Sequence, residues 1–133
     1  SDVLEHIPEP AQLWQEMARI LSLGGHVILN VPFFFRLHEE PFDFYRYTEY
    51  ALRRFAEHNN FEVIILQPIG GTPEIFADLI GKHARFIPLL GPGLVTVIHS
   101  FIHLLVSTPA GRKFSNSSGK IFPLGYFMVA QKK

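Results

Sequence analysis

The chain has 133 residues, which is enough for one small domain with a single core. Its 12 basic and 12 acidic residues balance, and without a basic surplus the sequence does not favour nucleic-acid binding. There is no cysteine, so disulfides and thiolate chemistry are excluded, and the composition fits a cytoplasmic location.

The first part of the chain shows a strand end, a helix and a strand. Residues 2–7 form a short apolar run that is typical of a strand end, and two prolines stop it. Apolar side chains recur at helical spacing over residues 11–21, and the pair Gly24-Gly25 predicts the end of that helix. Residues 26–31 are nearly all apolar, which predicts a strand buried on both faces of a parallel sheet.

The pattern then repeats. Residues 33–47 predict a loop, and Thr48 is the expected N-cap of a helix that ends at Asn59-Asn60. Strands are predicted over residues 61–67 and 124–131. Helices and strands that alternate with short loops indicate an α/β fold.

Residues 72–122 interrupt the alternation as a hydrophobic insert or cap. No charged residue occurs between Arg85 and Arg112, but prolines and glycines break this stretch. Its longest unbroken piece, residues 94–106, is short for a membrane span. A buried helix or a cap over a site is favoured, with peripheral membrane contact as an alternative. Residues 115–119 predict a polar loop.

Two stretches of the chain carry a family resemblance. The first is VLEHIPEP (residues 3–10), followed by a helix, Leu23-Gly24-Gly25 and a strand that ends at Val31-Pro32. It resembles the fourth strand, helix, glycine pair and fifth strand of the class I S-adenosylmethionine-dependent methyltransferases, in particular the small-molecule branch called type 11. The second, His38 followed by PFDFYRYT (residues 41–48), resembles an H…P-x-D-x-x-R-x-T segment of a bacterial subset.

The resemblance implies the C-terminal part of a Rossmann-like methyltransferase sheet, with a helical hydrophobic insert before the last strand. Residues 1–133 would form a partial methyltransferase domain. Its cofactor would be S-adenosylmethionine, and its acceptor a small or lipid-like molecule. The glycine-rich loop and the acidic ribose-binding residue of the family do not occur here. Because the chain also starts at Ser1 without methionine, we expect a fragment that binds the cofactor weakly or not at all when alone.

The resemblance also places residues around the reaction. Leu4, Glu5 and His6 would border the methyl donor, because ligands of doubly wound sheets bind beyond the carboxyl ends of the strands. The loop after the next strand would face the acceptor, through four catalytic candidates: His38, Asp43, Arg46 and Tyr47.

His38 and Asp43 are the candidate general bases, since methyl transfer to oxygen or nitrogen needs a proton removed from the acceptor. The alternative is that Asp43 and Arg46 form an ion pair that pins the loop, with His38 at the surface.

A metal site is a further alternative. In ubiquinone-type O-methyltransferases a similar acidic-x-x-Glu-His cluster binds a divalent metal, and here Asp2, Glu5 and His6 have that spacing. Oxygen-rich ligation of this kind would suit magnesium. The favoured interpretation is that Glu5 and His6 simply bound the cofactor pocket, with no metal ligands in the chain. His99 and His103 lie four residues apart but lack a third ligand.

An alternative function is association without catalysis. A partial sheet exposes an edge strand and an uncovered face, which favours contact with a second copy, a partner chain or a membrane surface. The oligomeric state distinguishes this function from catalysis by a monomer.

Overall fold

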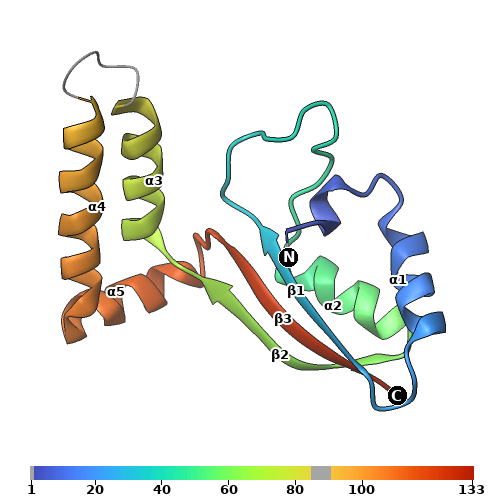
Figure 1. Cartoon of the computed structure of the whole chain (residues 1–133). Coiled ribbons are helices and arrows are strands. Elements are labelled where there is room, and N and C mark those ends of the chain that lie inside the picture. Colours follow the sequence, from blue (N-terminus) through green and yellow to red (C-terminus); the bar gives the residue numbers. More distant parts are fainter. Residues whose placement is uncertain (1, 85–90) are drawn as a thin grey trace. The chain divides into compact units, whose positions relative to one another are not determined.

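The computed structural model describes residues 2–84 and 91–133, and the chain divides into two compact units (Figure 1). The sheet unit comprises Ser1–Pro68 and Gly125–Lys133, and the helical unit comprises Ile69–Leu124. The elements of the sheet unit follow in the order η1 (Leu4–His6, a 3-10 helix), α1 (Pro10–Ile20), β1 (His26–Pro32), α2 (Glu49–His58), β2 (Phe61–Ile69) and β3 (Gly125–Lys132). The predicted alternation of helices and strands is therefore confirmed.

Within the described residues the three strands form one sheet with the order β1-β3-β2. β3 runs antiparallel to β1, from the pair His26 and Gln131 to the pair Pro32 and Gly125. The prediction of a parallel sheet around β1 is thus wrong on the side of β3. On the other side of β1, Asp2 forms an isolated parallel bridge with Asn30. The apolar run over residues 2–7 is therefore extended only at this bridge, and Leu4–His6 form a 3-10 helix instead of a strand end.

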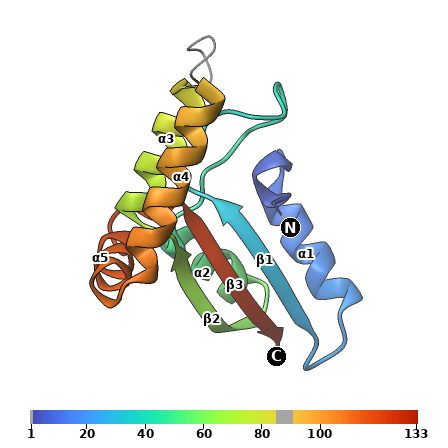
Figure 2. The ribbon, with the colours of Figure 1, turned by 60° about the vertical axis from the view of Figure 1, so that its left-hand side comes forward.

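The core of the sheet unit lies on one face of the sheet. Figure 2 shows β3 between β1 and β2, with α2 behind the strands. Val27 and Val31 of β1 are buried in this core, whereas Ile28 between them is 62% exposed. The prediction that β1 is buried on both faces is therefore wrong, because only one face is covered by the part of the chain that is described.

Local signals in the sequence determine where the two helices of the sheet unit begin and end. The Thr48 side chain accepts a hydrogen bond from the Ala51 amide and caps α2, as predicted. Gly24 adopts a φ of +79°, which glycine tolerates without steric cost, and turns the chain from α1 into β1. Its amide donates to the Lys132 carbonyl, so the turn is tied to the end of β3.

The helical unit contains α3 (Thr72–Ala84), α4 (Gly91–Ser107) and α5 (Pro109–Gly119), so the insert is helical as predicted. Two details differ from expectation. Residues 115–119 belong to α5 instead of a polar loop, because Thr108 caps this helix and its turns continue to Gly119. The apolar side chains of α4 are mostly exposed within the chain, among them Val97, Phe101 and Leu104, which contradicts the buried-helix interpretation.

The unbroken piece of the uncharged stretch, residues 94–106, is short for a membrane span, and residues 85–90 lie outside the described part of the chain. In the described ranges, no single helix is long and apolar enough to cross a membrane. Among the described helices, one bent pair, Gly93–Ser107 and Pro109–Gly119, which meet at an angle of 97°, reaches that length and composition together.

Candidate functional site

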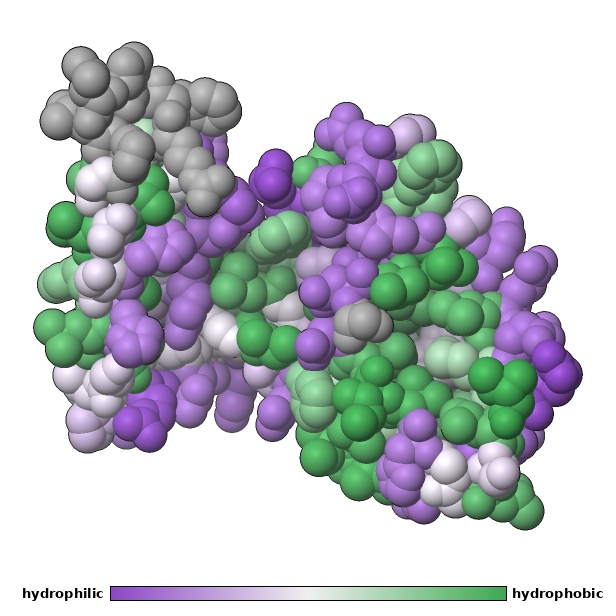
Figure 3. All heavy atoms as spheres, in the orientation of Figure 1, coloured by the Kyte–Doolittle hydropathy of each residue, from purple (hydrophilic) through white to green (hydrophobic). Residues whose placement is uncertain are grey.

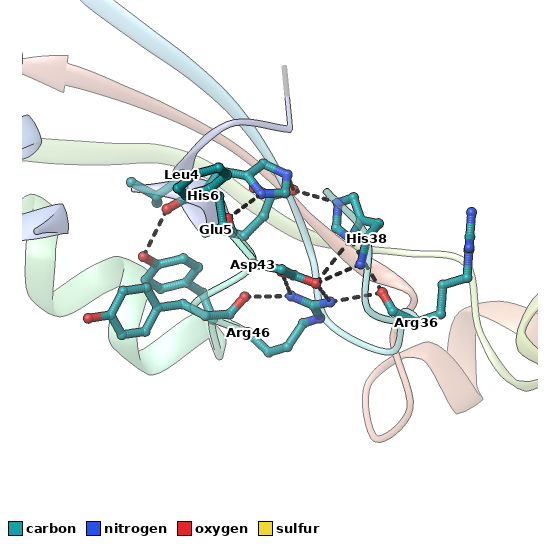
Figure 4. Close-up of polar contacts among 10 residues, drawn as sticks. Leu4, Glu5, His6, Arg36, His38, Asp43 and Arg46 are labelled. Carbon is teal, nitrogen blue, oxygen red and sulfur yellow. Dashed lines mark hydrogen bonds and ion pairs between the residues drawn. The ribbon is translucent and has the colours of Figure 1, made fainter. Parts of the chain in front are cut away.

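The two segments that carry the resemblance meet beside the carboxyl end of β1. The loop after β1 folds back over η1, and the Phe44 and Tyr45 amides both donate to the Glu5 carbonyl, at 2.9 and 3.3 Å. Figure 4 shows the side chains of Glu5, His6, His38, Asp43 and Arg46 gathered at this place. The structure thus brings together the residues predicted for the donor and for the acceptor.

Leu4 and Tyr47 form the buried base of this cluster. Both side chains belong to the hydrophobic core, and the Tyr47 hydroxyl donates a 3.1 Å hydrogen bond to the Leu4 carbonyl. Burial raises the pKa of Tyr47, with the neighbouring Tyr45 and Glu5 as smaller causes, so the phenol stays protonated. The hydroxyl predicted to handle an acceptor is therefore engaged in holding the loop against η1.

Asp43 and Arg46 form a bidentate ion pair. Two guanidinium nitrogens of Arg46 lie 2.6 and 2.7 Å from the two carboxylate oxygens, and the Asp43 side chain is only 2% exposed. Arg46 also donates to the carbonyls of Tyr45 and Arg36, which fixes the course of the loop. The hydrogen bonds from Arg46 hold the pKa of Asp43 far below its ordinary range against the opposing effect of burial, so this carboxylate stays ionised. It is a poor general base, and its geometry suits a positioning role.

His38 is held by Asp43 and faces inward. The His38 amide donates to Oδ2 of Asp43 at 3.0 Å, and Nδ1 of its ring lies 3.2 Å from the same oxygen. Nδ1 also contacts the Arg36 carbonyl at 3.3 Å. The opposite ring nitrogen, Nε2, lies 3.7 Å from Oε1 of Glu5. Its side chain is 19% exposed, so His38 is accessible but does not stand out at the surface.

Glu5 lies at the centre of the cluster and is fully buried. Its Oε1 is 3.7 Å from Nε2 of His6 as well as from His38. Neither of its carboxylate oxygens has a hydrogen-bond partner among the residues that the structure describes. His6 is oriented by a 2.8 Å contact between its Nδ1 and the Phe42 carbonyl. One donor atom from each of Glu5, His6 and His38 lies within 4.8 Å of the other two.

The sequence did not indicate this trio. The metal alternative paired Glu5 and His6 with Asp2, but Asp2 is exposed and pairs with the backbone of Asn30. The third residue of the cluster is instead His38, although it follows His6 by 32 residues in the chain. Both segments are predicted at strand ends, and this was the signal in the sequence that could have placed His38 beside Glu5 and His6.

No family model and no curated protein matches this chain. Among solved structures, it is similar to the [4+2]-cyclase SpnF, with 16% identity, a TM-score of 0.50, and coverage of 98% of this chain and 47% of the cyclase. A second similar structure is phosphoethanolamine N-methyltransferase 2 of Haemonchus contortus in complex with phosphomonomethylethanolamine and S-adenosylhomocysteine. It has 18% identity, a TM-score of 0.48, and coverage of 98% of this chain and 32% of that one.

This chain therefore spans about half the length of the cyclase. The similarity to the cyclase supports the α/β fold class at a low sequence identity, and it shows the fold and not the reaction.

Proposed function

We propose that the sheet unit belongs to an S-adenosylmethionine-dependent methyltransferase that acts on a small or lipid-like acceptor. The observation that carries this proposal is the convergence of two segments that resemble this family on one buried cluster. Glu5 and His6 come from the segment expected to border the cofactor, and His38 comes from the loop expected to face the acceptor. They meet beyond the carboxyl end of β1, where α/β sheets bind their ligands.

The cluster suits the proton chemistry of methyl transfer. When an acceptor hydroxyl or amine attacks the methyl group of a sulfonium, its proton must leave, and a histidine held by a carboxylate can take it. Nδ1 of His38 faces Asp43 and the Arg36 carbonyl, so Nε2 is the nitrogen that accepts the proton. Asp43, Arg46 and Tyr47 then act as positioning residues for the loop. Glu5 and His6 face the donor side, and Leu4 supports them from the hydrophobic core.

The fold alone does not select this reaction. The solved structure at a TM-score of 0.50 is that of a [4+2]-cyclase, so one architecture serves different chemistries. The resemblance of the sequence and the composition of the cluster favour methyl transfer. The cofactor-gripping glycine loop expected for this family does not occur in the sequence, so we expect weak cofactor binding by this chain alone.

The proposal is tested by titrating the 133-residue chain with S-adenosylhomocysteine in the presence of a chelator, followed by amide NMR spectra. We expect a dissociation constant in the millimolar range, about −4 kcal/mol, because the glycine loop that would hold the cofactor does not occur in the sequence. Shifts are expected to concentrate in residues 4–6 and in the loop of residues 33–47. Unchanged spectra at ten millimolar ligand, roughly ten times that dissociation constant, would contradict the proposal. So would shifts confined to the helical unit.

Two alanine variants provide the control. His6→Ala removes a ring that faces Glu5 and is expected to weaken the shifts. His58→Ala removes a histidine of α2 that contacts only the Arg54 carbonyl of its own helix among the hydrogen bonds of the described residues, and it should leave the titration unchanged. Equal effects of the two substitutions would show that the shifts do not report on the cluster.

A second candidate function is self-association through the uncovered face of the sheet. Ile28 pairs with Val129 in the register of β1 and β3, and Ile28 is 62% exposed. Ile64 of β2 is also exposed, and strand alternation puts it opposite the core residues Phe61 and Val63. Figure 3 shows a green, apolar area over the strands. An apolar sheet face of this kind favours contact with a second copy.

Sedimentation equilibrium tests this function on the unaltered chain and on two matched variants. We expect a dimer that Ile28→Lys weakens by about tenfold or more, because burying one isoleucine contributes roughly 1.5–3 kcal/mol. Ile20→Lys is the control, since Ile20 is 68% exposed but ends α1 instead of lying in the sheet. A monomer at all concentrations would exclude this function. Vesicle binding by that monomer would point to a membrane surface instead.

A further inference from the structure

Among the described residues, the Glu5 carboxylate has no hydrogen bond to offset its burial, although the positive charge of Arg46 lies near enough to interact with it. It is fully buried, and neither oxygen receives a hydrogen bond within the described ranges of the chain. A buried carboxylate without partners is strongly unfavourable, and folded proteins normally pair such a charge or bind a metal to it. Both imidazoles point a nitrogen at the same oxygen, at 3.7 Å, which is too long for a hydrogen bond.

The two histidines are held in the state that binds metals. Nδ1 of His6 faces the Phe42 carbonyl at 2.8 Å, and a carbonyl can only accept, so this nitrogen carries the hydrogen. Nδ1 of His38 faces the Arg36 carbonyl and Asp43, which are acceptors as well. In the neutral rings, both Nε2 atoms therefore carry a lone pair, and both lie 3.7 Å from Oε1 of Glu5. Three electron-rich atoms gathered within 4.8 Å of one another suit a cation between them.

We propose that Oε1 of Glu5, Nε2 of His6 and Nε2 of His38 bind a divalent transition-metal ion of the zinc type. Two imidazoles and one carboxylate suit zinc and related ions better than magnesium, which prefers oxygen ligands. An ion about 2.0–2.2 Å from each donor separates its donors by roughly 3.3 Å. The observed 3.7 Å from Glu5 to each ring nitrogen is close to that spacing, and one ligand atom of each of the three residues lies within 4.8 Å of the other two.

The hydrogen-bond partners of His6 and His38 are of the kinds that surround metal ligands in proteins. Ligating histidines commonly donate their second N–H to a carbonyl or a carboxylate, and both kinds of partner occur here in Phe42 and Asp43. Arg46 fixes Asp43 in turn, and the Glu5 carbonyl is held by two loop amides. Three protein ligands leave at least one position on the ion open, as in zinc sites that bind a substrate atom.

This metal site goes beyond the proposed methyl transfer and does not depend on it. The role of His38 as proton acceptor applies to the metal-free chain, because with an ion bound its Nε2 would be a ligand. A bound ion would supply Lewis acidity, which would favour loss of the proton from an acceptor hydroxyl at the open position. A titration with metal alone contains neither cofactor nor acceptor. If no metal binds in this titration, the proposed metal site is wrong, and the S-adenosylhomocysteine titration still tests the proposed methyl transfer.

The experiment is a titration of the chelator-treated chain with Zn²⁺ by calorimetry and with Co²⁺ by visible absorption. We expect one equivalent of each ion, with the intense visible bands of four- or five-coordinate Co²⁺. Glu5→Gln and His38→Ala are expected to weaken binding about 100-fold or more. Asp43→Asn should weaken it about 10- to 100-fold while it leaves the shape of the bands unchanged, as expected for a residue that orients a ligand.

The matched control is the double variant His99→Ala/His103→Ala, which removes the two histidines of α4 at helical spacing. It should bind Zn²⁺ as the unaltered chain does, and circular dichroism of every variant checks that the fold is kept. The proposal is overturned if the unaltered chain shows no Co²⁺ bands. It is also overturned if the α4 variant loses the ion, or if Glu5→Gln retains full affinity.

Discussion

In the presence of a chelator at pH 8, the Glu5→Gln variant is expected to unfold at a higher temperature than the unaltered chain. Glutamine keeps the shape of the side chain and removes a buried charge that has no hydrogen bond in the described part of the molecule. Its amide can also donate to the ring nitrogens of His6 and His38. Replacing buried ion pairs by uncharged residues of similar volume is often neutral or stabilising by about 1–4 kcal/mol, and for this single carboxylate we expect a gain toward the lower end of that range.

Thermal unfolding followed by circular dichroism measures this gain. Adding Zn²⁺ should raise the unfolding temperature of the unaltered chain and leave the variant unchanged, because ligands stabilise only the state that binds them. Glu16→Gln is the control: Glu16 is an exposed glutamate paired with Arg19 on α1, and its loss should change little. A variant that is less stable than the unaltered chain in chelator would mean that the Glu5 charge is compensated by neighbours and that no cation is needed.

The elements of the sheet unit could be predicted where the signal is local. Helical spacing and a glycine pair place α1 and its end to within one residue, and Thr48 marks the first turn of α2. These features depend on capping and backbone conformation, which a few neighbouring residues determine. The strand over residues 26–31 is predicted from its run of apolar residues, and the structure extends it by one residue to Pro32.

The arrangement of the sheet could not be predicted from such signals. An apolar run such as β1 is typical of a strand covered on both faces, yet Ile28 is largely exposed while Val27 and Val31 are buried. Burial depends on what packs against each face, and that information lies far away in the sequence. The antiparallel pairing of β1 with β3 joins residues about 100 positions apart, for example His26 and Gln131.

The candidate site was predicted in its segments but not in its contacts. Residues 4–6 and 33–47 are both expected at strand ends, and from this expectation it follows that the two segments lie close together. The inward orientation of His38 depends on Asp43 and on the Arg36 carbonyl, which no pattern in the sequence reveals. Likewise, Tyr47 resembles a residue of the acceptor side, and only the structure shows its hydroxyl bound to the Leu4 carbonyl.

Trp14→Ala is expected to cost about 3–5 kcal/mol of the free energy of unfolding, as large-to-small substitutions of buried aromatics do. Trp14 of α1 is fully buried, stacks parallel to Phe55 of α2 with ring centroids 6.2 Å apart, and meets the edge of Phe61 at 5.6 Å. It therefore links both helices to the start of β2. Because domains are stable by only about 5–15 kcal/mol, the variant should lie close to its unfolding transition at 25 °C.

Trp14→Phe separates the packing of the ring from the polarity of the indole. The indole N–H of Trp14 has no hydrogen-bond partner in residues 2–84 and 91–133, so phenylalanine loses volume but also removes a buried donor that costs free energy. Its cost should be less than half that of alanine. Urea denaturation followed at 222 nm measures both variants, since Trp14 is the only tryptophan and its fluorescence is lost. Equal costs for the two variants would show that the aromatic stack does not hold the helices, and that the core of the sheet unit depends on the strands alone.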